Sequence, residues 1–180
     1  MVLQLRQPIN TIDEFIAYAL RPENAERNFE FVDGETIEKM PGTTENSTLA
    51  FYLGFIVQSH CEKNNIPCYI SGEAGAYRIG NNVLAPDFAY KSTPATTEYP
   101  DPIAPLWVME VISANDKPAA IRKKRQRYLE AGILLWELYP DERVIDVYAP
   151  GQALITYEFG SIIPVSVIAD LNVEVAKLFR

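Results

Sequence analysis

The chain has 180 residues, of which 48% are hydrophobic and 22% charged, and its formal net charge is −8. This size and composition are typical of one folded domain, so we expect a single domain over residues 1–180. The negative charge argues against a protein that coats nucleic acid through a general basic surface. No run approaches the ~18 apolar residues of a membrane span. Residues 1–10 lack a signal-peptide pattern, which predicts a cytoplasmic protein with no membrane partner.

The N-terminal part predicts a helix, a β-hairpin and a second helix. The stretch at residues 11–20 opens with Thr followed three positions later by Glu, the spacing of a capping box. Asp33-Gly34 is a favoured turn dipeptide, and it predicts a hairpin over residues 28–40. Apolar residues recur every three or four positions over residues 44–63, which predicts a long amphipathic helix.

The middle of the chain alternates polar turns with apolar runs that predict strands. Residues 68–80 and 81–90 predict two strands joined by a Gly-Asn-Asn turn. Residues 92–103 form a polar loop rich in proline. The apolar run over residues 104–113 predicts a buried strand.

A third helix is predicted over residues 115–132. Asn115 or Asp116 can cap its N-terminus, and Pro118 lies near its first turn. Gly132 provides the stop at its C-terminus.

The last part of the chain predicts further strands and a short closing element. Residues 133–139 and 143–149 predict two strands, residues 153–160 one more, and residues 170–179 the closing element. The order of elements predicts a mixed α/β (α+β) fold, with a mixed central sheet flanked by helices and an N-terminal helix and hairpin.

Two acidic residues lie within otherwise apolar strands. Asp87 and Glu110 are 23 residues apart, and one loop joins their strands, so the strands can lie side by side with both carboxylates at one spot. Two carboxylates in an apolar site repel, and one stays protonated unless a cation lies between them. Mg²⁺ or Mn²⁺ is the natural occupant of such a site.

The third predicted helix supplies a cation to the same place. Ile121, Lys124 and Tyr128 share a helical face, which we expect to turn toward the sheet, while Lys123 and Arg127 turn outward. A lysine directed at two acids and a metal can polarise a water or stabilise charge on a phosphate.

Each feature also has a structural interpretation. A lone Glu110 in a strand is more often an ion-pair partner than a catalyst, and the basic run at residues 122–127 is usually a solvated helix face. His60, Cys61 and Cys68 lack the spacing of a zinc site. The combination of Asp, Glu and an inward Lys on successive elements favours a catalytic site.

The same residues resemble the restriction-endonuclease-like superfamily, whose motif is written PD-(D/E)xK. Pro86 and Asp87 correspond to PD, and Glu110 corresponds to the second acid. The position of the motif lysine is taken by Ile112, so the motif is broken there.

The resemblance is closer to the bacterial Uma-two family of nucleases, and it covers nearly the whole chain in the same order. The matching segments are FEFVDGE (29–35), APDFAY (85–90), EVIS (110–113), KRQRYLEAGI (124–133), LLWELYP (134–140) and VIDVYAP (144–150).

This resemblance implies a restriction-endonuclease-like core and a specific set of site residues. Asp87, Glu110 and the backbone carbonyl of Val111 would hold the metal. Lys124 would replace the missing motif lysine. Glu30 of the hairpin would be the acid nearest the site, either as an additional ligand of the metal or as a partner of the residues that hold it.

The chain departs from the family pattern at two places. The histidine that often follows the hairpin is absent, with Asn46 near its position, and Ala120 replaces an aspartate that often precedes the lysine. Both departures affect the surroundings of the acid–acid–lysine set rather than the set itself.

The sequence therefore predicts a Mg²⁺- or Mn²⁺-dependent endonuclease that acts on DNA, with Lys123, Arg125 and Arg127 available to phosphates. A homodimer is expected from the resemblance, because cutting both strands needs two sites. Two alternatives stay open. The fold can serve as an inactive binding or assembly module, which the charge and the two departures favour. It can also hydrolyse a smaller phosphate ester, although no glycine-rich phosphate loop is present.

Overall fold

A six-stranded sheet forms the centre of the molecule, seen here in a computed structural model that describes residues 9–40 and 42–179. Its strands are Tyr69–Gly72 (β3), Phe88–Lys91 (β6), Trp107–Val111 (β7), Leu134–Tyr139 (β8), Val144–Tyr148 (β9) and Ile155–Tyr157 (β10). The strand order is β10-β9-β8-β7-β6-β3. Only β7 and β8 run parallel, and every other neighbouring pair is antiparallel. The predicted mixed sheet is thus confirmed.

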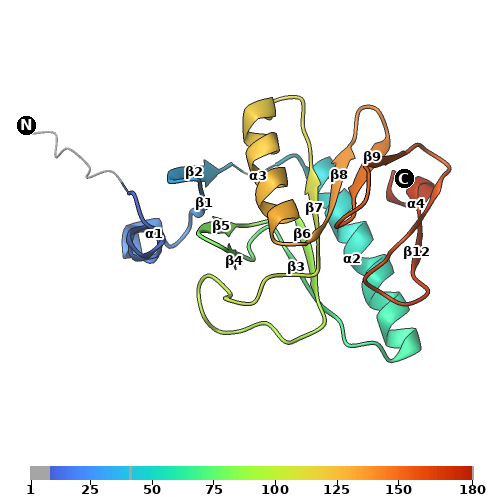
Figure 1. Ribbon diagram of the computed structural model, residues 1–180, viewed down its shortest axis with the longest axis horizontal. Helices are drawn as coiled ribbons and strands as arrows, with labels where there is room; N and C mark the ends of the chain where they lie inside the picture. The colour runs from blue at the N-terminus through green and yellow to red at the C-terminus, as the bar shows by residue number, and fades with distance from the viewer. Residues whose placement is uncertain (1–8, 41, 180) are drawn as a thin grey trace, which may run out of the picture.

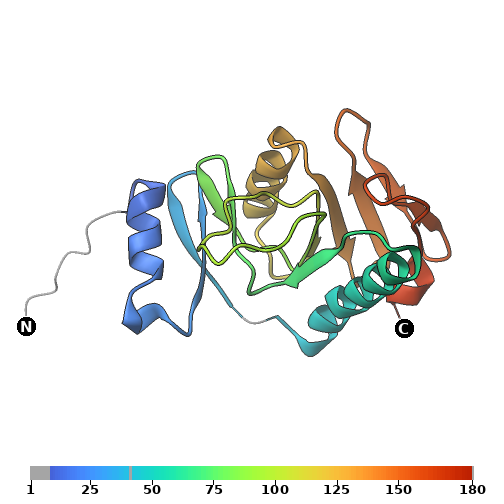
Figure 2. The same ribbon diagram turned by 90° about the horizontal axis from the view of Figure 1, so that it is seen from below.

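Two helices cover opposite faces of this sheet (Figures 1 and 2). Thr44–Asn64 (α2) lies against one face, and Pro118–Glu130 (α3) connects the parallel strands across the other face. A parallel pair needs such a crossover, because a short turn cannot return the chain to the same end of the sheet.

Strand alternation decides which side chains meet which helix. Trp107, Met109 and Val111 of β7 belong to the large core under α2. Val108 packs in the smaller core beside Tyr128 of α3, so β7 residues of even number face α3. Glu110 follows this alternation and therefore faces α3.

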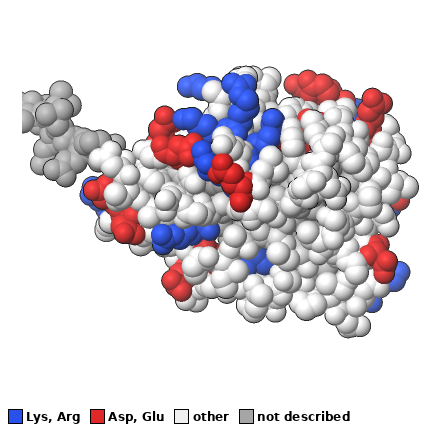
Figure 3. All heavy atoms as spheres, viewed as in Figure 1, with Lys and Arg blue, Asp and Glu red and all other residues white. Residues whose placement is uncertain are grey.

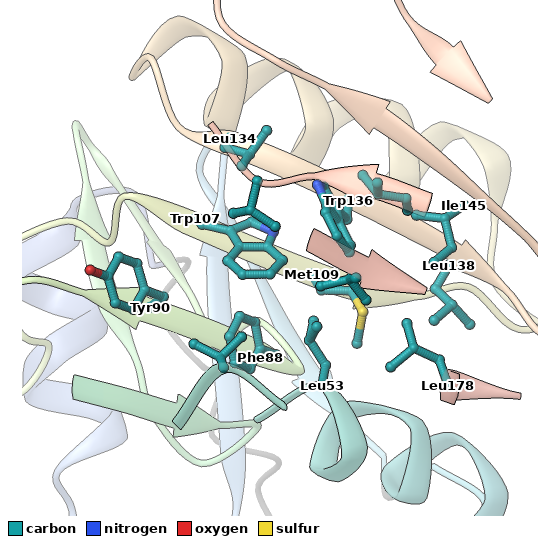
Figure 4. Close-up of a cluster of buried hydrophobic side chains, with 14 of the residues drawn as sticks. Leu53, Phe88, Tyr90, Trp107, Met109, Leu134, Trp136, Leu138, Ile145 and Leu178 are labelled. Atoms are coloured by element: carbon teal, nitrogen blue, oxygen red, sulfur yellow. The ribbon is translucent and has the colours of Figure 1, made fainter. Parts of the chain in front are cut away.

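Aromatic side chains fill the core under α2 (Figure 4). The rings of Trp107 and Trp136 have centroids 4.6 Å apart, and those of Phe88 and Trp107 are 5.0 Å apart in an edge-on arrangement. Leu53 of α2 is fully buried against them. This apolar layer fixes the register of β6, β7 and β8, and with it the positions of the polar residues on the other face.

A second sheet lies at the N-terminal end of the molecule (Figure 1). Its strands are Asn28–Val32 (β1), Glu35–Lys39 (β2), Tyr77–Ile79 (β4) and Asn82–Leu84 (β5), in the order β2-β1-β5-β4.

The two faces of β1 pack against different helices. Phe29 and Phe31 pack with Phe15 of the first helix, Ile12–Ala19 (α1). Val32 belongs instead to the core that contains Tyr128 of α3. Glu30 shares the alternation of Val32, so it also faces α3.

The predicted hairpin and the first two helices are confirmed. Asp33 and Gly34 form the turn between β1 and β2, with φ of 51° and 82°. These positive values explain why the dipeptide is needed there. Thr11 and Glu14 form the predicted capping box of α1, which lowers the pKa of Glu14 through hydrogen bonds from the Asn10 and Thr11 backbone.

The predicted cap of α3 is wrong. Lys117 is the N-cap residue, and its side chain makes no capping hydrogen bond, while Pro118 opens the helix as expected. The Asp116 carboxylate instead accepts hydrogen bonds from the backbone and hydroxyl of Ser113. Gly132, with φ of 69°, follows the helix end as predicted.

The sequence predicts two strands over residues 68–90, whereas the structure contains four. β3 and β6 belong to the central sheet, whereas β4 and β5 form a hairpin in the N-terminal sheet. Pro86 lies between β5 and β6 and has no N–H to donate, so the ladder is interrupted where the chain passes between sheets.

The C-terminal part forms a small sheet of Ile162–Pro164 (β11) and Asn172–Glu174 (β12), followed by Val175–Leu178 (α4). It covers the end of the core under α2, as the predicted closing element requires. Among the described residues, no helix is both long and apolar enough to cross a bilayer. Residues 1–8, on which the signal-peptide prediction mainly depends, lie outside the described part.

Candidate active site

The three candidate acids come from both sheets and face the same helix. Phe88 of β6 pairs with Met109 of β7, so Asp87 lies opposite Glu110 at the next position of the antiparallel register. Glu30 enters from β1 of the other sheet. The prediction that the strands of Asp87 and Glu110 lie side by side is confirmed.

Asp87 is held by one backbone group and one lysine. Its Oδ2 accepts a hydrogen bond from the Val111 backbone N–H at 2.8 Å. Its Oδ1 lies 3.2 Å from Nζ of Lys39, which also donates to the Ala85 carbonyl at 2.6 Å. The carboxylate is therefore fixed in orientation between β7 and the end of the hairpin.

Lys124 joins the other two acids. Its Nζ lies 2.8 Å from Oε1 of Glu110 and 2.9 Å from Oε1 of Glu30. Tyr128, one turn further along α3, donates its hydroxyl to the same Glu110 oxygen at 2.6 Å. Lys124 thus points inward, as the sequence predicts, and the helix supplies two donors to Glu110.

Glu30 is the most enclosed of the acids, with only 4% of its side chain exposed. Its Oε1 also accepts the backbone N–H of Ala85 at 2.9 Å. A buried carboxylate requires such partners, because an unpaired charge in the interior is costly. Glu30 consequently ties the hairpin to both α3 and the segment that carries Asp87.

The electrostatics of the cluster depend on burial and on the close approach of like charges. Burial, aided by the charges of Asp87 and Glu30, raises the pKa of Glu110 from 4.5 to about 7, although Lys124 opposes the shift. Burial disfavours the charge on Lys124, but Glu110 and Glu30 outweigh it and hold the pKa of Lys124 above its ordinary value. Burial likewise raises the pKa of Tyr128, which stays a hydrogen-bond donor.

The three acids differ in exposure. Asp87 exposes 22% of its side chain, compared with 11% for Glu110 and 4% for Glu30, while Lys39 and Lys124 expose similar shares of 18% and 16%. Asp87 is therefore the acid of the cluster that is most accessible to a ligand.

The residues present fit a hard divalent cation. Asp87, Glu110 and the Val111 carbonyl are oxygen donors, which Mg²⁺ and Mn²⁺ prefer. Burial, with the charges of Asp87 and Glu30, raises the pKa of Glu110, and a bound cation would favour the ionised form of this carboxylate. Within residues 9–40 and 42–179, no three His, Cys, Asp or Glu side chains converge as a complete ion-binding group. A site with two carboxylates would draw its other ligands from water and substrate, as is usual for Mg²⁺.

The basic residues of α3 that were candidates for phosphate contacts are paired with acids. Lys123 contacts Glu35 at 3.0 Å, and Arg127 contacts Asp33 at 2.8 Å, both in the hairpin. Figure 3 shows Lys and Arg atoms gathered over α3 with acidic atoms directly beside them.

The guanidinium group of Arg125 binds an acid of the central sheet. It forms two hydrogen bonds with the carboxylate of Glu137, which is buried on β8 beside Glu110. The hydroxyl of Tyr139 donates to the same Glu137 carboxylate. Arg125 therefore stabilises the buried charge of Glu137 and is less available to a phosphate than the sequence predicts.

Sequence reasoning missed Lys39 and the contact made by Tyr128. Tyr128 lies four residues after Lys124 on the inward face of α3, so the helical period would have placed it beside Glu110. Lys39 has no comparable signal, because it reaches Asp87 only through the docking of the hairpin against the central sheet.

His60, Cys61 and Cys68 have other surroundings in the fold. The ring Nε2 of His60 lies 2.9 Å from the Ala169 carbonyl oxygen, and Cys61 is buried in the core under α2. Burial raises the pKa of the Cys68 thiol to about 12, so this residue stays protonated at neutral pH.

Comparison with known proteins agrees with this fold. The chain is similar to the crystal structure of "a putative nuclease belonging to DUF820" from Anabaena variabilis ATCC 29413, with a TM-score of 0.77 and 23% identity. The match covers 94% of this chain and 97% of the other, which shows a shared restriction-endonuclease-like fold. No curated protein matches the chain at a significant level.

The family comparison covers almost the whole chain. The model of the Uma2 family, described as "Putative restriction endonuclease", matches residues 12–176. This range contains β1, β7 and α3, which carry Glu30, Glu110 and Lys124, and also Asp87, which lies directly before β6. The chain belongs to the Uma2 family of restriction-endonuclease-like proteins.

Proposed function

We propose that the protein is a Mg²⁺- or Mn²⁺-dependent endonuclease that hydrolyses phosphodiester bonds of DNA. The observation that carries this proposal is the contact of Lys124 with both Glu110 and Glu30, next to Asp87. Membership of the Uma2 family supports the same reaction class.

Asp87, Glu110 and the carbonyl of Val111 would hold the divalent ion. When bound, the ion would lower the pKa of a water and offset charge on the substrate phosphate. The Val111 N–H already fixes one oxygen of Asp87, so this acid needs little reorganisation.

Lys124 would orient the attacking water or neutralise charge that develops on the phosphate oxygens. Glu30 acts through Lys124: it holds the ammonium group in the site and has little exposure of its own. Tyr128 fixes the orientation of the Glu110 carboxylate in a similar way.

The first test compares metal binding with cleavage. Calorimetric titration of Mn²⁺ should give binding to wild type and to Lys124→Met, and a loss of at least tenfold in affinity for Glu110→Gln. Cleavage of supercoiled plasmid should fall by at least 10²-fold in both variants. Lys123→Met is the matched control and should cut like wild type, because Lys123 forms its ion pair with Glu35 at the start of β2 rather than with an acid of the cluster. Cleavage by Lys124→Met at the wild-type rate would remove Lys124 from the mechanism.

One observation favours the alternative of an inactive binding module. Glu30, Asp87, Glu110, Lys39 and Lys124 all have partners within the described chain, as a structural cluster requires. Metal binding by wild type without cleavage of duplex DNA, single-stranded DNA or RNA would support the module. Cleavage of small phosphodiesters alone would instead favour the third candidate, a hydrolase of smaller esters.

We also propose a homodimer, in which two copies of the site serve the two strands of a duplex. Light scattering should give a mass near twice the 20.3 kDa of one chain. A monomer at concentrations where plasmid is cut would contradict this proposal and leave the single-site chemistry unaffected.

A further inference from the structure

Lys39 is the second cation of the site, and its position follows from the hairpin. In the β1–β2 register Asn28 pairs with Lys39 and Glu30 pairs with Ile37, so Lys39 and Glu30 lie on one face of the hairpin. Ile37 on that face packs against the core that contains Tyr128. The hairpin thus contributes Glu30 and Lys39 to two different parts of the same site.

The two lysines differ in the number of carboxylates that they contact. Lys124 is shared by two carboxylates at 2.8 and 2.9 Å. Lys39 contacts a single carboxylate, Asp87, at the longer distance of 3.2 Å, and its shorter contact is to the neutral Ala85 carbonyl. Lys39 therefore has more capacity to accept a further anion than Lys124.

The existing partners, rather than exposure, distinguish the two lysines, because 18% of the Lys39 side chain and 16% of the Lys124 side chain are exposed. Lys39 lies beside Asp87, the most exposed of the three acids at 22%, while Lys124 lies between Glu30 and Glu110, which are 4% and 11% exposed. Arg27, another cation of this hairpin region, is paired with Glu38. Lys123 and Arg127 contact Glu35 at the start of β2 and Asp33 in the turn instead.

The charge of the cluster suits one phosphodiester group. With every group ionised, three carboxylates and two ammonium groups leave one net negative charge. A divalent cation would change this to one net positive charge, which complements the single negative charge of a phosphodiester. Without Lys39 the loaded cluster would have no net charge, and its attraction for a phosphate would be weaker.

We propose that Lys39 is the phosphate-binding residue of this site, with its ammonium group contacting a non-bridging oxygen of the substrate backbone. The inference rests on the proposed nuclease function and adds to it the group that recognises the anion. Such a contact positions the substrate but carries no sequence information.

Substrate binding without cleavage tests this role directly. A fluorescent duplex oligonucleotide is titrated in Ca²⁺ and separately in EDTA, with fluorescence anisotropy as the readout. Lys39→Met should weaken binding in Ca²⁺ about tenfold and lower the salt slope of the binding constant by about one. Lys39→Arg should restore most of the binding. The control Lys123→Met removes the same charge close by and should bind like wild type.

Two further readouts separate a phosphate contact from an effect on Asp87. Calorimetric affinity for Mn²⁺ should be equal or higher in Lys39→Met, because the contact that occupies Oδ1 of Asp87 is gone. In cleavage assays the variant should raise KM more than it lowers kcat. Weaker Mn²⁺ binding with unchanged DNA binding would overturn the proposal, because Lys39 would then act only by orienting Asp87.

The outcomes also separate this inference from the nuclease proposal. Wild-type cleavage with unchanged DNA binding by Lys39→Met would overturn the role of Lys39 and leave the nuclease function standing. DNA binding without cleavage, lost in Lys39→Met, would support Lys39 and count against catalysis. No DNA binding by wild type in Ca²⁺ or in EDTA would overturn both.

Discussion

Glu110 illustrates how the alternation of one strand determines the chemistry of a residue. Its neighbours Met109 and Val111 point into the core under α2, so Glu110 points to the opposite face, where Lys124 and Tyr128 meet it. The same reasoning applied to the sequence predicts Asp87, Glu110 and Lys124 together, because period two in strands and period 3.6 in helices are local properties. Lys39 depends on the docking of two sheets, which no local period encodes.

The raised pKa of Glu110 predicts a specific pH dependence of stability in the metal-free protein. Its pKa is about 7 in the folded chain, against an ordinary value of 4.5. Between these values the folded state holds a proton that the unfolded state releases, so the free energy of unfolding falls as pH rises. Urea unfolding in EDTA should show a loss on the order of 2 kcal/mol between about pH 4.5 and 7.

The control for this prediction is Glu110→Gln, which cannot ionise and should lose most of that slope. Saturating Mn²⁺ should flatten the wild-type slope in the same range, because a cation favours the ionised carboxylate. An equal slope in wild type and Glu110→Gln would assign the pH dependence to other groups.

At the scale of elements, α3 does more than connect the parallel strands. Its inward face carries Lys124 and Tyr128, and its side carries Arg127, which contacts Asp33 in the hairpin turn. Helix ends marked by Pro and Gly were predictable because those residues act locally. The division of residues 68–90 between two sheets was not, because it depends on which partner strands are available.

Loosening the contact between α3 and the hairpin should weaken the site without removing any of its groups. Arg127 contacts both oxygens of Asp33, so Arg127→Gln should make opening of the hairpin easier. Amide hydrogen exchange of β1 and β2 should become roughly fivefold faster.

The matched control for this prediction is Lys123→Gln. Its pair with Glu35 is more exposed, so exchange in the hairpin should change little. Faster exchange in both variants would indicate that any loss of charge on α3 destabilises the hairpin. Unchanged exchange in Arg127→Gln would show that the apolar packing of the hairpin alone holds it in place.

At the scale of the whole molecule, a chain with a net charge of −8 has few cations left for a phosphate backbone. Lys123, Arg125 and Arg127 are engaged by acids, and Arg122 and Lys117 are exposed near the start of α3. The net charge of the sequence led to the expectation that a general basic surface is not the basis of nucleic-acid binding. The sequence did not reveal that most cations of the basic run are already paired, because their partners are distant along the chain.

This distribution of charge predicts a shallow dependence of DNA binding on salt. With about two or three phosphates neutralised, the logarithm of the binding constant in Ca²⁺ should fall with a slope of about −2 to −3 against the logarithm of salt concentration. Anisotropy titrations over a fourfold range of salt measure this slope. A slope near −6 or steeper would contradict it and would require a basic contact surface formed on binding or contributed by a second copy.

The parallel pairing of β7 with β8 has a consequence for how the chain folds. These strands come together only after the whole crossover that contains α3 has closed, and such non-local pairing is slow compared with a hairpin. The step that joins them is also the step that brings Lys124 to Glu110. During synthesis, a chain that has not yet emerged as far as β8 has its three acids before Lys124 docks on them. We expect this acid–lysine cluster to be completed among the last events of folding.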